Sequence, residues 1–218
     1  MNVQKGSVYI VGGGPSLKGF DFNLLKNKDV IAVNCAVDQV PWAKYFITMD
    51  YALFNVYPRT KIEQFTGKRY FISNMVPPYM IVQDGKIMDS RNQLCFDLGC
   101  FDDVIFSYDE AGIGFNWNDF RNGHNSGYSA LQLAVLLGYK QIHLLGIDLC
   151  IGKEIHCHKR YEPGRQKWFV RALPKYVDFF RAALRVLEDT DIHIRSYCKG
   201  SPLNDIITCS SLDEIKQH

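Results

Sequence analysis

The sequence lacks the features that mark several large classes of protein. It contains no run of about 18 apolar residues, which a membrane-spanning helix needs, and glycines interrupt the short apolar run near its start. Neither a membrane span nor a signal peptide is therefore predicted, and we expect a cytoplasmic protein. Neither sign of charge dominates, because 25 Lys and Arg residues face 23 Asp and Glu residues. Composition thus gives no support to nucleic-acid binding.

Paired cysteines are also missing. The seven cysteines are scattered and show no CxxC spacing, which favours reduced thiols over a disulfide framework. The HCH stretch at 156–158 has no second cluster of Cys or His elsewhere in the sequence. Because successive side chains of an extended segment point in opposite directions, we do not expect a structural zinc site there.

The hydrophobic pattern indicates one α/β domain. Of the 218 residues, 47% are hydrophobic, enough to bury a sizeable core. Short β-rich runs alternate with helical patterns, which predicts a Rossmann-like domain with a mainly parallel sheet flanked by helices. We expect strands at 8–11, 29–34, 44–50, 68–73, 103–108, 141–148 and 191–197, and helices at 126–139 and about 168–187. Pro174 should kink the second helix or mark its true start.

Within this single domain, 1–218, two segments break the pattern. The alternation weakens around 74–123, which we interpret as an irregular insertion. Around 150–167 the sequence is strongly basic, and we interpret this loop as a lid that closes over a polyphosphate or an acidic acceptor. An ordinary solvated loop is the alternative.

The loop in VYIVGGGPSL, residues 8–17, is the first candidate binding segment. Gly12, Gly13 and Gly14 can adopt positive φ and let backbone N–H groups approach a ligand, and Ser16 adds a hydroxyl. Such loops bind phosphate. The spacing matches neither GxGxxG nor GK[ST], so NAD and Walker-type ATP sites are not indicated. A tight strand exit is the alternative interpretation.

Further polar residues follow other predicted strands. In doubly wound sheets, ligands bind outside the carboxyl ends of the strands, and a polar turn before the helix at 126–139 resembles an N-cap. The residues expected at this edge are Asn34, Asp50, Asn125, Ser126, Gly127 and Asp148. For Asn34, turning the chain is an equally good explanation, and for Asp148, capping a loop or helix.

Several of these stretches together resemble a known family. GGGPSL at 12–17, AVN at 32–34, SGYSALQLAVLLGYKQIHLLGIDL at 126–149, a histidine-bearing loop and SYCKGSPLNDI at 196–206 follow one another, in an order similar to that of bacterial family 42 sialyltransferases. The same framework resembles the MptE-like and motility-accessory-factor group, and DLCIGKEIHCH at 148–158 is its matching segment. The region 51–120 matches neither.

The resemblance implies a nucleotide-activated donor and a histidine general base. Carried over by position, the donor site would comprise Gly12, Gly14, Pro15, Ser16, Asn34, Asn125, Ser126, Gly127 and Asp148, and the base would be His156 or His158. Gly13 replaces the asparagine of the sialyltransferase loop, which puts cytidine-sialic acid itself in doubt while a nucleotide donor stays expected. The phosphate and lid residues would be Lys159, Arg160, Tyr161 and Arg165.

Three functions remain open from the sequence. The first is a glycosyltransferase that moves a sugar from a nucleotide-sugar (CMP-sialic-acid-like) donor to a hydroxyl acceptor without a cofactor. A histidine suits the role of general base in this reaction, because it can accept the proton of the acceptor hydroxyl at neutral pH. The second is a 6-hydroxymethylpterin-type diphosphokinase that uses ATP and Mg²⁺, with Asp50 and Asp148 as candidate metal ligands. The third is a nucleotide-binding module without catalysis. His124 is a second candidate base, His143 is expected to be packed in a strand, and the oligomeric state is left open.

Overall fold

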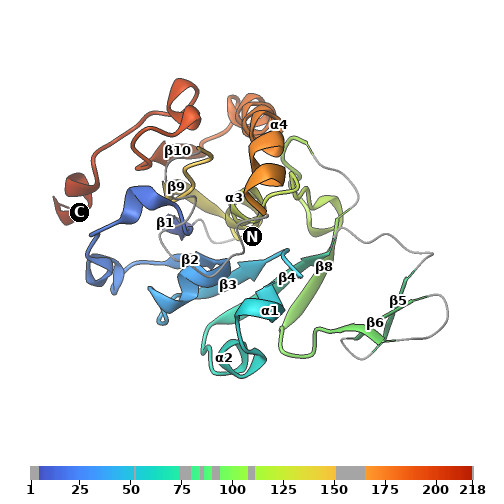
Figure 1. Cartoon of the computed structure of the whole chain (residues 1–218). Helices are drawn as coiled ribbons and strands as arrows, with labels where there is room; N and C mark the ends of the chain where they lie inside the picture. Colours follow the sequence, from blue (N-terminus) through green and yellow to red (C-terminus); the bar gives the residue numbers. More distant parts are fainter. Residues whose placement is uncertain are drawn as a thin grey trace.

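A parallel sheet of seven strands runs through the centre of the computed structural model, which describes residues 5–51, 53–73, 80–83, 86–89, 94–107, 111–150 and 165–217 (Figure 1). From one edge to the other, its strands are β10 (His193–Ser196), β9 (Tyr139–Leu145), β1 (Lys5–Val11), β2 (Val30–Val33), β3 (Tyr45–Thr48), β4 (Lys68–Ser73) and β8 (Asp103–Phe106). Every neighbouring pair is parallel. The predicted Rossmann-like α/β fold is confirmed, with a strand in each of the seven predicted places.

Two helices cover one face of the sheet, α3 (Ser126–Leu136) and α4 (Arg165–Leu187) (Figure 1). The prediction that the first continues to 139 is wrong, because Gly138 takes a φ of +86° and Tyr139 already begins β9. Pro174 lies inside α4 and does not mark its start. Helix α4 packs on the core through residues such as Phe180, which is fully buried.

Shorter elements cover the opposite face. They are η1 (Pro15–Leu17), η2 (Phe22–Leu25), η3 (Asn34–Asp38), α1 (Leu53–Val56) and α2 (Arg59–Glu63), and α1 and α2 lie across the sheet from α3 and α4 (Figure 1). A second buried cluster, with Leu25, Phe46 and Phe71 at 0% exposure, fills this side. Because none of these elements is longer than five residues, none leaves a helical period in the sequence.

The segment predicted to be an irregular insertion contains a small antiparallel sheet. Its strands are β5 (Met80–Gln83), β6 (Lys86–Asp89) and β7 (Leu94–Asp97), in that order, and β5 and β6 project from the β8 side of the domain (Figure 1). The remaining elements are η4 (Trp117–Asp119), η5 (Pro202–Asp205) and η6 (Leu212–Gln217). The sequence prediction missed all three strands of the small sheet.

Helix α3 contains no charged residue, and its polar side chains bind the loop at 111–122. The Gln132 side chain is fully buried and forms two hydrogen bonds of 2.8 Å with the N–H and carbonyl of Gly114. The Tyr128 hydroxyl donates to the Gly112 carbonyl, and the Ser129 hydroxyl donates to the Asn122 carbonyl. Buried polar groups need such partners. The polar residues of α3 therefore fix the segment that leads into the helix itself.

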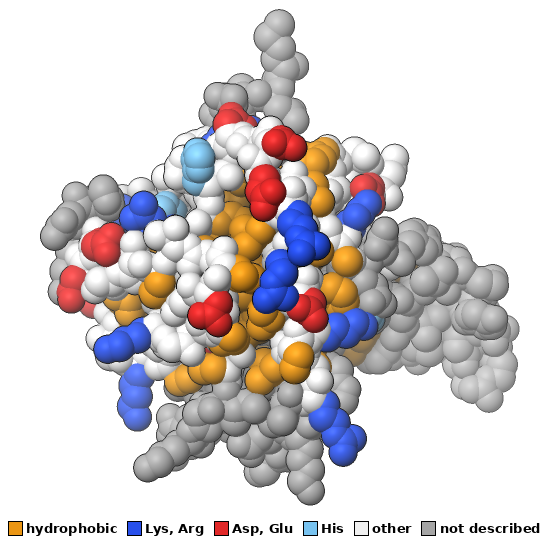
Figure 2. Space-filling view, turned by 90° about the horizontal axis from the view of Figure 1, so that it is seen from above, with side chains coloured by type: hydrophobic (Ala, Val, Ile, Leu, Met, Phe, Trp, Pro, Cys, Tyr) orange, Lys and Arg blue, Asp and Glu red, His pale blue; other side chains and the backbone are white. Residues whose placement is uncertain are grey.

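The surface shows no preference for one sign of charge on the face that is visible from above. Lys and Arg side chains alternate there with Asp and Glu, and apolar side chains lie between them, in the described part of that face (Figure 2). This mixture matches the formal net charge of +2. Within the described ranges, none of the helices combines the length and apolar character that crossing a bilayer requires.

A cluster at the amino end of the sheet should make stability depend on pH. Burial alone would raise the pKa of Asp29, but hydrogen bonds from Tyr139 and from Lys44 (2.9 Å) outweigh it and lower the pKa. A carboxyl whose pKa is lowered on folding stabilises the protein above its unfolded pKa of about 3.9, and this contribution disappears as the pH falls through the folded value. We therefore expect Asp29→Asn to lose less unfolding free energy than the wild type between pH 5 and pH 2. Urea denaturation at each pH measures this free energy. If it falls equally with pH in both proteins across this range, the expectation is contradicted.

Candidate functional site

The loops that follow β1 and β9 continue the pairing of these strands past their ends. The Gly12 N–H donates to the Leu145 carbonyl at 2.7 Å, and the Gly14 N–H donates to the Gly146 carbonyl at 2.9 Å. A Cβ atom on Gly12 would lie 2.5 Å from the Gly146 oxygen, well inside contact distance. The two loops therefore touch through their backbones, and only glycine fits at this point.

Close approach, and not positive φ, explains the glycines of the GGGPS loop. None of Gly12, Gly13 and Gly14 has a positive φ, and Gly14 is extended at φ −69°, ψ 149°. The glycines therefore do not use the left-handed conformations that they could adopt. A Cβ atom on Gly14 would lie 2.5 Å from the carboxyl carbon of Asp148, so the carboxylate occupies the space that a side chain would need.

Ser16 and Asp148, both predicted to bind the nucleotide, bind each other. One Asp148 oxygen accepts the Ser16 N–H at 2.7 Å, and the other accepts the Ser16 hydroxyl at 2.5 Å. Asp148 is only 5% exposed. We call this pair of hydrogen bonds the Ser16–Asp148 clamp. Since the single hydroxyl hydrogen of Ser16 is donated to Asp148, this hydroxyl has none to donate to a ligand.

Cys198 contacts the segment that leads from β9 to Asp148. Its Sγ atom accepts the Ile147 N–H at 3.1 Å, and its thiol lies against the Leu144 carbonyl at 3.5 Å. Burial, with a smaller contribution from the negative charge of Asp148, raises the pKa of Cys198 to about 12. The thiol is therefore protonated and structural at neutral pH. The sequence analysis predicted only a reduced thiol.

Gly13 presents the one backbone donor of the loop that the protein does not use itself. The N–H groups of Gly12, Gly14, Ser16 and Leu17 all donate within the chain, and Pro15 has no N–H. Among the described residues, the N–H of Gly13 has no hydrogen-bond acceptor, and this residue is half-exposed. The register pairs Val11 with Ala32, so Gly13 follows alongside Asn34, two residues further on.

Asn34 ends β2 with its amide oriented by neighbours on β3. Its φ is +53°, a left-handed conformation that asparagine tolerates better than most residues. The Thr48 hydroxyl accepts the Asp50 N–H at 3.1 Å and donates to the Asn34 Oδ1 atom at 2.7 Å. This pattern fixes the amide oxygen of Asn34 toward Thr48, which leaves the NH₂ group as a donor. Thr48 was not among the predicted residues.

Asn125 and Ser126 begin α3 as the sequence predicted. The Asn125 Oδ1 atom accepts the Tyr128 N–H at 3.1 Å and caps the helix, and the Ser126 hydroxyl oxygen accepts the Met49 N–H at 3.4 Å. Gly127 lies against Ile147, whose Cδ1 atom would be 2.9 Å from an added Cβ. The start of α3 therefore contacts the ends of both β3 and β9.

The edge assembled in this way is rich in hydrogen-bond donors. The Gly13 N–H, the NH₂ groups of Asn34 and Asn125 and the hydroxyl of Ser126 are available, while the oxygens of both amides already accept bonds from the protein. Groups that present free N–H or O–H hydrogens are complementary to ligands that accept, such as phosphate, carboxylate and carbonyl oxygens. The local chemistry therefore suits an anionic, oxygen-rich ligand.

Asp148 is poorly suited to bind magnesium in this arrangement, while the assignment of Asp50 remains a prediction. Both oxygens of Asp148 already accept hydrogen bonds from Ser16, and a divalent cation would have to displace them. Across the part of the chain that the structure describes, no three His, Cys, Asp or Glu side chains come together as potential metal ligands.

Only some of the histidines and lid residues named from the sequence lie among the described residues. His156, His158, Lys159, Arg160 and Tyr161 lie outside the described residues, as does most of the predicted lid, and of Arg165 only the backbone at the start of α4 is described. These assignments remain predictions. His124 immediately precedes the Asn125 cap and is half-buried, with its ring 6.3 Å from that of Phe179. His143 stacks on Tyr9 with ring centroids 4.5 Å apart, as expected for a packed strand residue.

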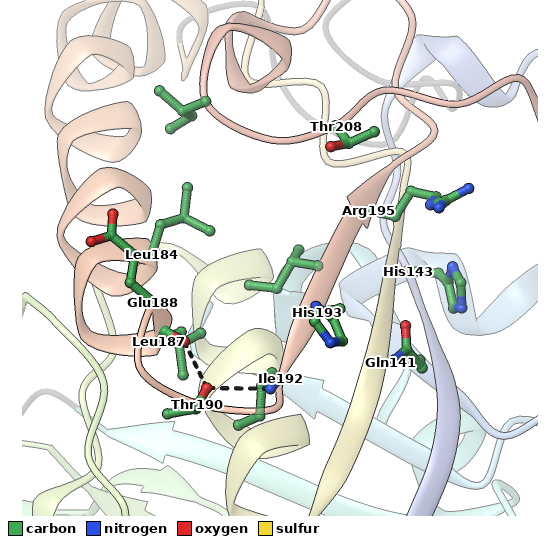
Figure 3. A pocket seen from close by; sticks show the side chains of 12 residues that line it. Gln141, His143, Leu184, Leu187, Glu188, Thr190, Ile192, His193, Arg195 and Thr208 are labelled. Carbon is green, nitrogen blue, oxygen red and sulfur yellow. Dashed lines mark hydrogen bonds between the residues drawn. The ribbon is translucent and has the colours of Figure 1, made fainter.

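A pocket of 480 Å³ lies between α4 and the outer edge of the sheet, and His143 is among the residues that line it (Figure 3). Leu184, Leu187 and Glu188 line it from the end of α4, and His193 and Arg195 line it from β10 (Figure 3). None of the predicted site residues borders this pocket. The candidate site is therefore the carboxyl edge of β1, β2 and β3.

Comparisons with known proteins give likeness in structure only. No family model matches the sequence, and neither does any curated protein. The fold is similar to the sialyltransferase CstII from Campylobacter jejuni in complex with cytidine-5'-monophosphate, at a TM-score of 0.54 and 22% identity over 96% of this chain and 87% of that chain. For the same enzyme in complex with CMP-3FNeuAc, the TM-score is 0.50 at 21% identity, covering 93% and 85%.

A second sialyltransferase gives the same result. The monofunctional α-2,3-sialyltransferase Cst-I from Campylobacter jejuni matches at a TM-score of 0.52 and 15% identity, over 97% of this chain and 83% of that chain. At such identities the similarity shows the fold. The resemblance inferred from the sequence is thus confirmed as structural similarity across nearly the whole chain.

Proposed function

We propose that the protein is a glycosyltransferase that moves a sugar from a CMP-sialic-acid-like donor to a hydroxyl acceptor. The observation that carries the proposal is the donor-rich edge formed by Gly13, Asn34, Asn125 and Ser126. It lies where ligands bind in doubly wound sheets, and solved structures of similar fold hold cytidine-5'-monophosphate and CMP-3FNeuAc.

The proposed reaction assigns one role to each group. A histidine of the 151–164 segment, His156 or His158, accepts the proton of the acceptor hydroxyl. The acceptor oxygen then forms a bond to the anomeric carbon, while the bond from that carbon to the phosphate oxygen breaks and the phosphate leaves with the electron pair. N–H groups at the edge of the sheet stabilise the charge of the leaving phosphate. Lys159, Arg160, Tyr161 and Arg165 are proposed to contact it from the lid.

Nucleotide binding tests the proposal directly. We expect calorimetry against CMP, UDP, GDP, ADP and ATP, each with and without Mg²⁺, to show CMP binding that needs no metal. A ligand at 100 times its dissociation constant raises the unfolding free energy by about 2.7 kcal/mol, so thermal shifts provide a second measurement. Binding of ATP only with Mg²⁺ would instead favour the diphosphokinase, and no binding of any nucleotide would refute the proposal.

Asn125→Asp separates the donor role of this side chain from its structural role. An aspartate caps a helix as well as asparagine does, so α3 should stay intact, but it replaces two N–H donors by a negative charge that repels phosphate. We expect CMP affinity to fall at least about tenfold, which corresponds to 1.4 kcal/mol, with little change in melting temperature.

The matched control is Asn116→Asp. Asn116 caps η4 in the same way, by accepting the Asn118 N–H at 3.0 Å, but it lies outside the candidate site. This variant should bind CMP like the wild type. If both variants lose the same affinity, the effect is one of net charge and not of the Asn125 donor.

A further inference from the structure

We infer that Asp148 is a positioning residue, which holds the Gly12–Ser16 loop in its binding conformation and contacts neither the nucleotide nor a metal. This inference rests on the proposed function of the same edge. It assigns to Asp148 a role different from those that the sequence suggested, donor binding and Mg²⁺ coordination.

The first argument is the position of the Ser16–Asp148 clamp in the sheet. The strand order reverses its direction between β1 and β9, and the chain after β1 covers one face of the sheet while the chain after β9 leads to α4 on the other. Such a switch point normally leaves a crevice between two diverging loops. Here the clamp crosses it and ties the loops together.

The second argument is that the protein surrounds the carboxylate. Gly14 lies directly against Asp148, and a Cβ atom there would come within 2.6 Å of both carboxylate oxygens. Cys198 lies on the inner side, where the Asp148 charge contributes to its raised pKa. Asp148 is 5% exposed and each of its oxygens already accepts a hydrogen bond from Ser16, so the carboxylate is turned toward the loop and not toward solvent.

The third argument is what the Ser16–Asp148 clamp fixes. Gly13 is held from both sides, because its neighbours Gly12 and Gly14 bind the backbone at Leu145 and Gly146, and the chain beyond them is anchored at Ser16. A donor fixed before the ligand arrives loses less conformational entropy on binding. The affinity of the Gly13 N–H for a phosphate oxygen should therefore depend on Asp148 without any direct contact.

The experiment compares a variant that preserves shape with one that preserves charge. In Asp148→Asn, the amide oxygen accepts the Ser16 N–H, and the NH₂ group donates to the Ser16 hydroxyl oxygen, so the loop stays fixed. Asp148→Glu keeps the charge but places an extra methylene in a space already filled by Gly14. We expect CMP affinity within about threefold of the wild type for Asp148→Asn and a loss of at least about tenfold for Asp148→Glu.

A direct ligand contact or a metal ligand predicts the opposite order, in which Asp148→Glu retains affinity and Asp148→Asn loses it. That result would overturn the inference. A double-mutant cycle adds a second criterion. If Asp148 acts through Ser16, then Ser16→Ala and Asp148→Ala should weaken CMP binding less together than the product of their single effects. Independent, multiplicative losses would contradict it.

Amide hydrogen exchange measures how firmly the Gly12–Ser16 loop is held when no nucleotide is present. The amides of Gly12 and Gly14 should exchange slowly in the wild type and in Asp148→Asn, and faster in Asp148→Ala. Unchanged exchange in Asp148→Ala would refute the positioning role even if CMP binds. Conversely, intact exchange behaviour with no CMP binding to the wild type would refute the proposed function and leave the structural role of the clamp established.

Discussion

Gly14→Ala is expected to break the Ser16–Asp148 clamp and to lower the unfolding free energy by about 1–3 kcal/mol, the usual range for overpacking. The added methyl group would lie 2.5 Å from the Asp148 carboxyl carbon, so the carboxylate must move away from Ser16. Because this also releases the loop that carries Gly13, CMP affinity should fall together with stability. Urea denaturation and calorimetry on the same preparation measure the two effects.

Gly6→Ala is the matched control. Gly6 lies in β1, and nothing in the described structure approaches within 4 Å of a Cβ atom added there. Since alanine loses less conformational entropy than glycine on folding, this variant should be as stable as the wild type or slightly more stable. If Gly14→Ala behaves like Gly6→Ala, the carboxylate does not occupy the space against Gly14 in solution.

Gln132→Leu is expected to destabilise the protein by about 2–6 kcal/mol, because it leaves the N–H and the carbonyl of Gly114 buried without the Gln132 partner, at about 1–3 kcal/mol each. The loop at 111–122 should become mobile, and limited proteolysis should cut the variant there before the rest of the domain.

Gln141→Leu provides the comparison for this second substitution. Gln141 lies on β9 with an exposed side chain, and the same exchange there removes no buried hydrogen bond. We expect a change within about 0.5 kcal/mol, as for most surface substitutions. A similar loss of stability in both variants would mean that the two Gln132–Gly114 hydrogen bonds contribute nothing specific.

The sequence predicted the main sheet because its strands carry a local signal. Runs such as VYIV and YFIT are almost wholly apolar, as is typical of strands buried on both faces. Helix α3 was located for the same reason, although its end was placed three residues too late, beyond Gly138. Strands β5 to β7 were missed although they are as long as β2 and β3, which were predicted. The apolar pattern weakens in their part of the sequence, so the strength of this pattern, and not strand length, decided which strands could be recognised.

The sequence analysis named most residues of the candidate site, but it did not predict which of them contact one another. Asn34 and Asp148 stand out locally as polar residues after apolar runs, Ser16 stands out as the hydroxyl after a glycine turn, and Asn125 as the polar residue before an apolar helix. That Ser16 meets Asp148, 132 positions away, depends on β1 and β9 being neighbours, which no local pattern encodes. Thr48 and Cys198 were missed because their roles arise from the partners that the fold brings to them. Which hydrogen of an amide or hydroxyl is left for a ligand can be decided only when those partners are known.

Strand β2 separates the pH-sensitive Asp29 from the carboxyl edge, so that the two can be studied independently. Asp29 precedes the strand, and Asn34 follows it; at about 3.3 Å per residue, roughly 16 Å lies between them. Substitutions this far apart, with no shared partners, usually have additive effects on stability. Asp29→Asn should therefore remove the pH-dependent contribution of Asp29 to stability without altering the carboxyl edge, so that any pH dependence of nucleotide binding in this variant arises elsewhere than at Asp29.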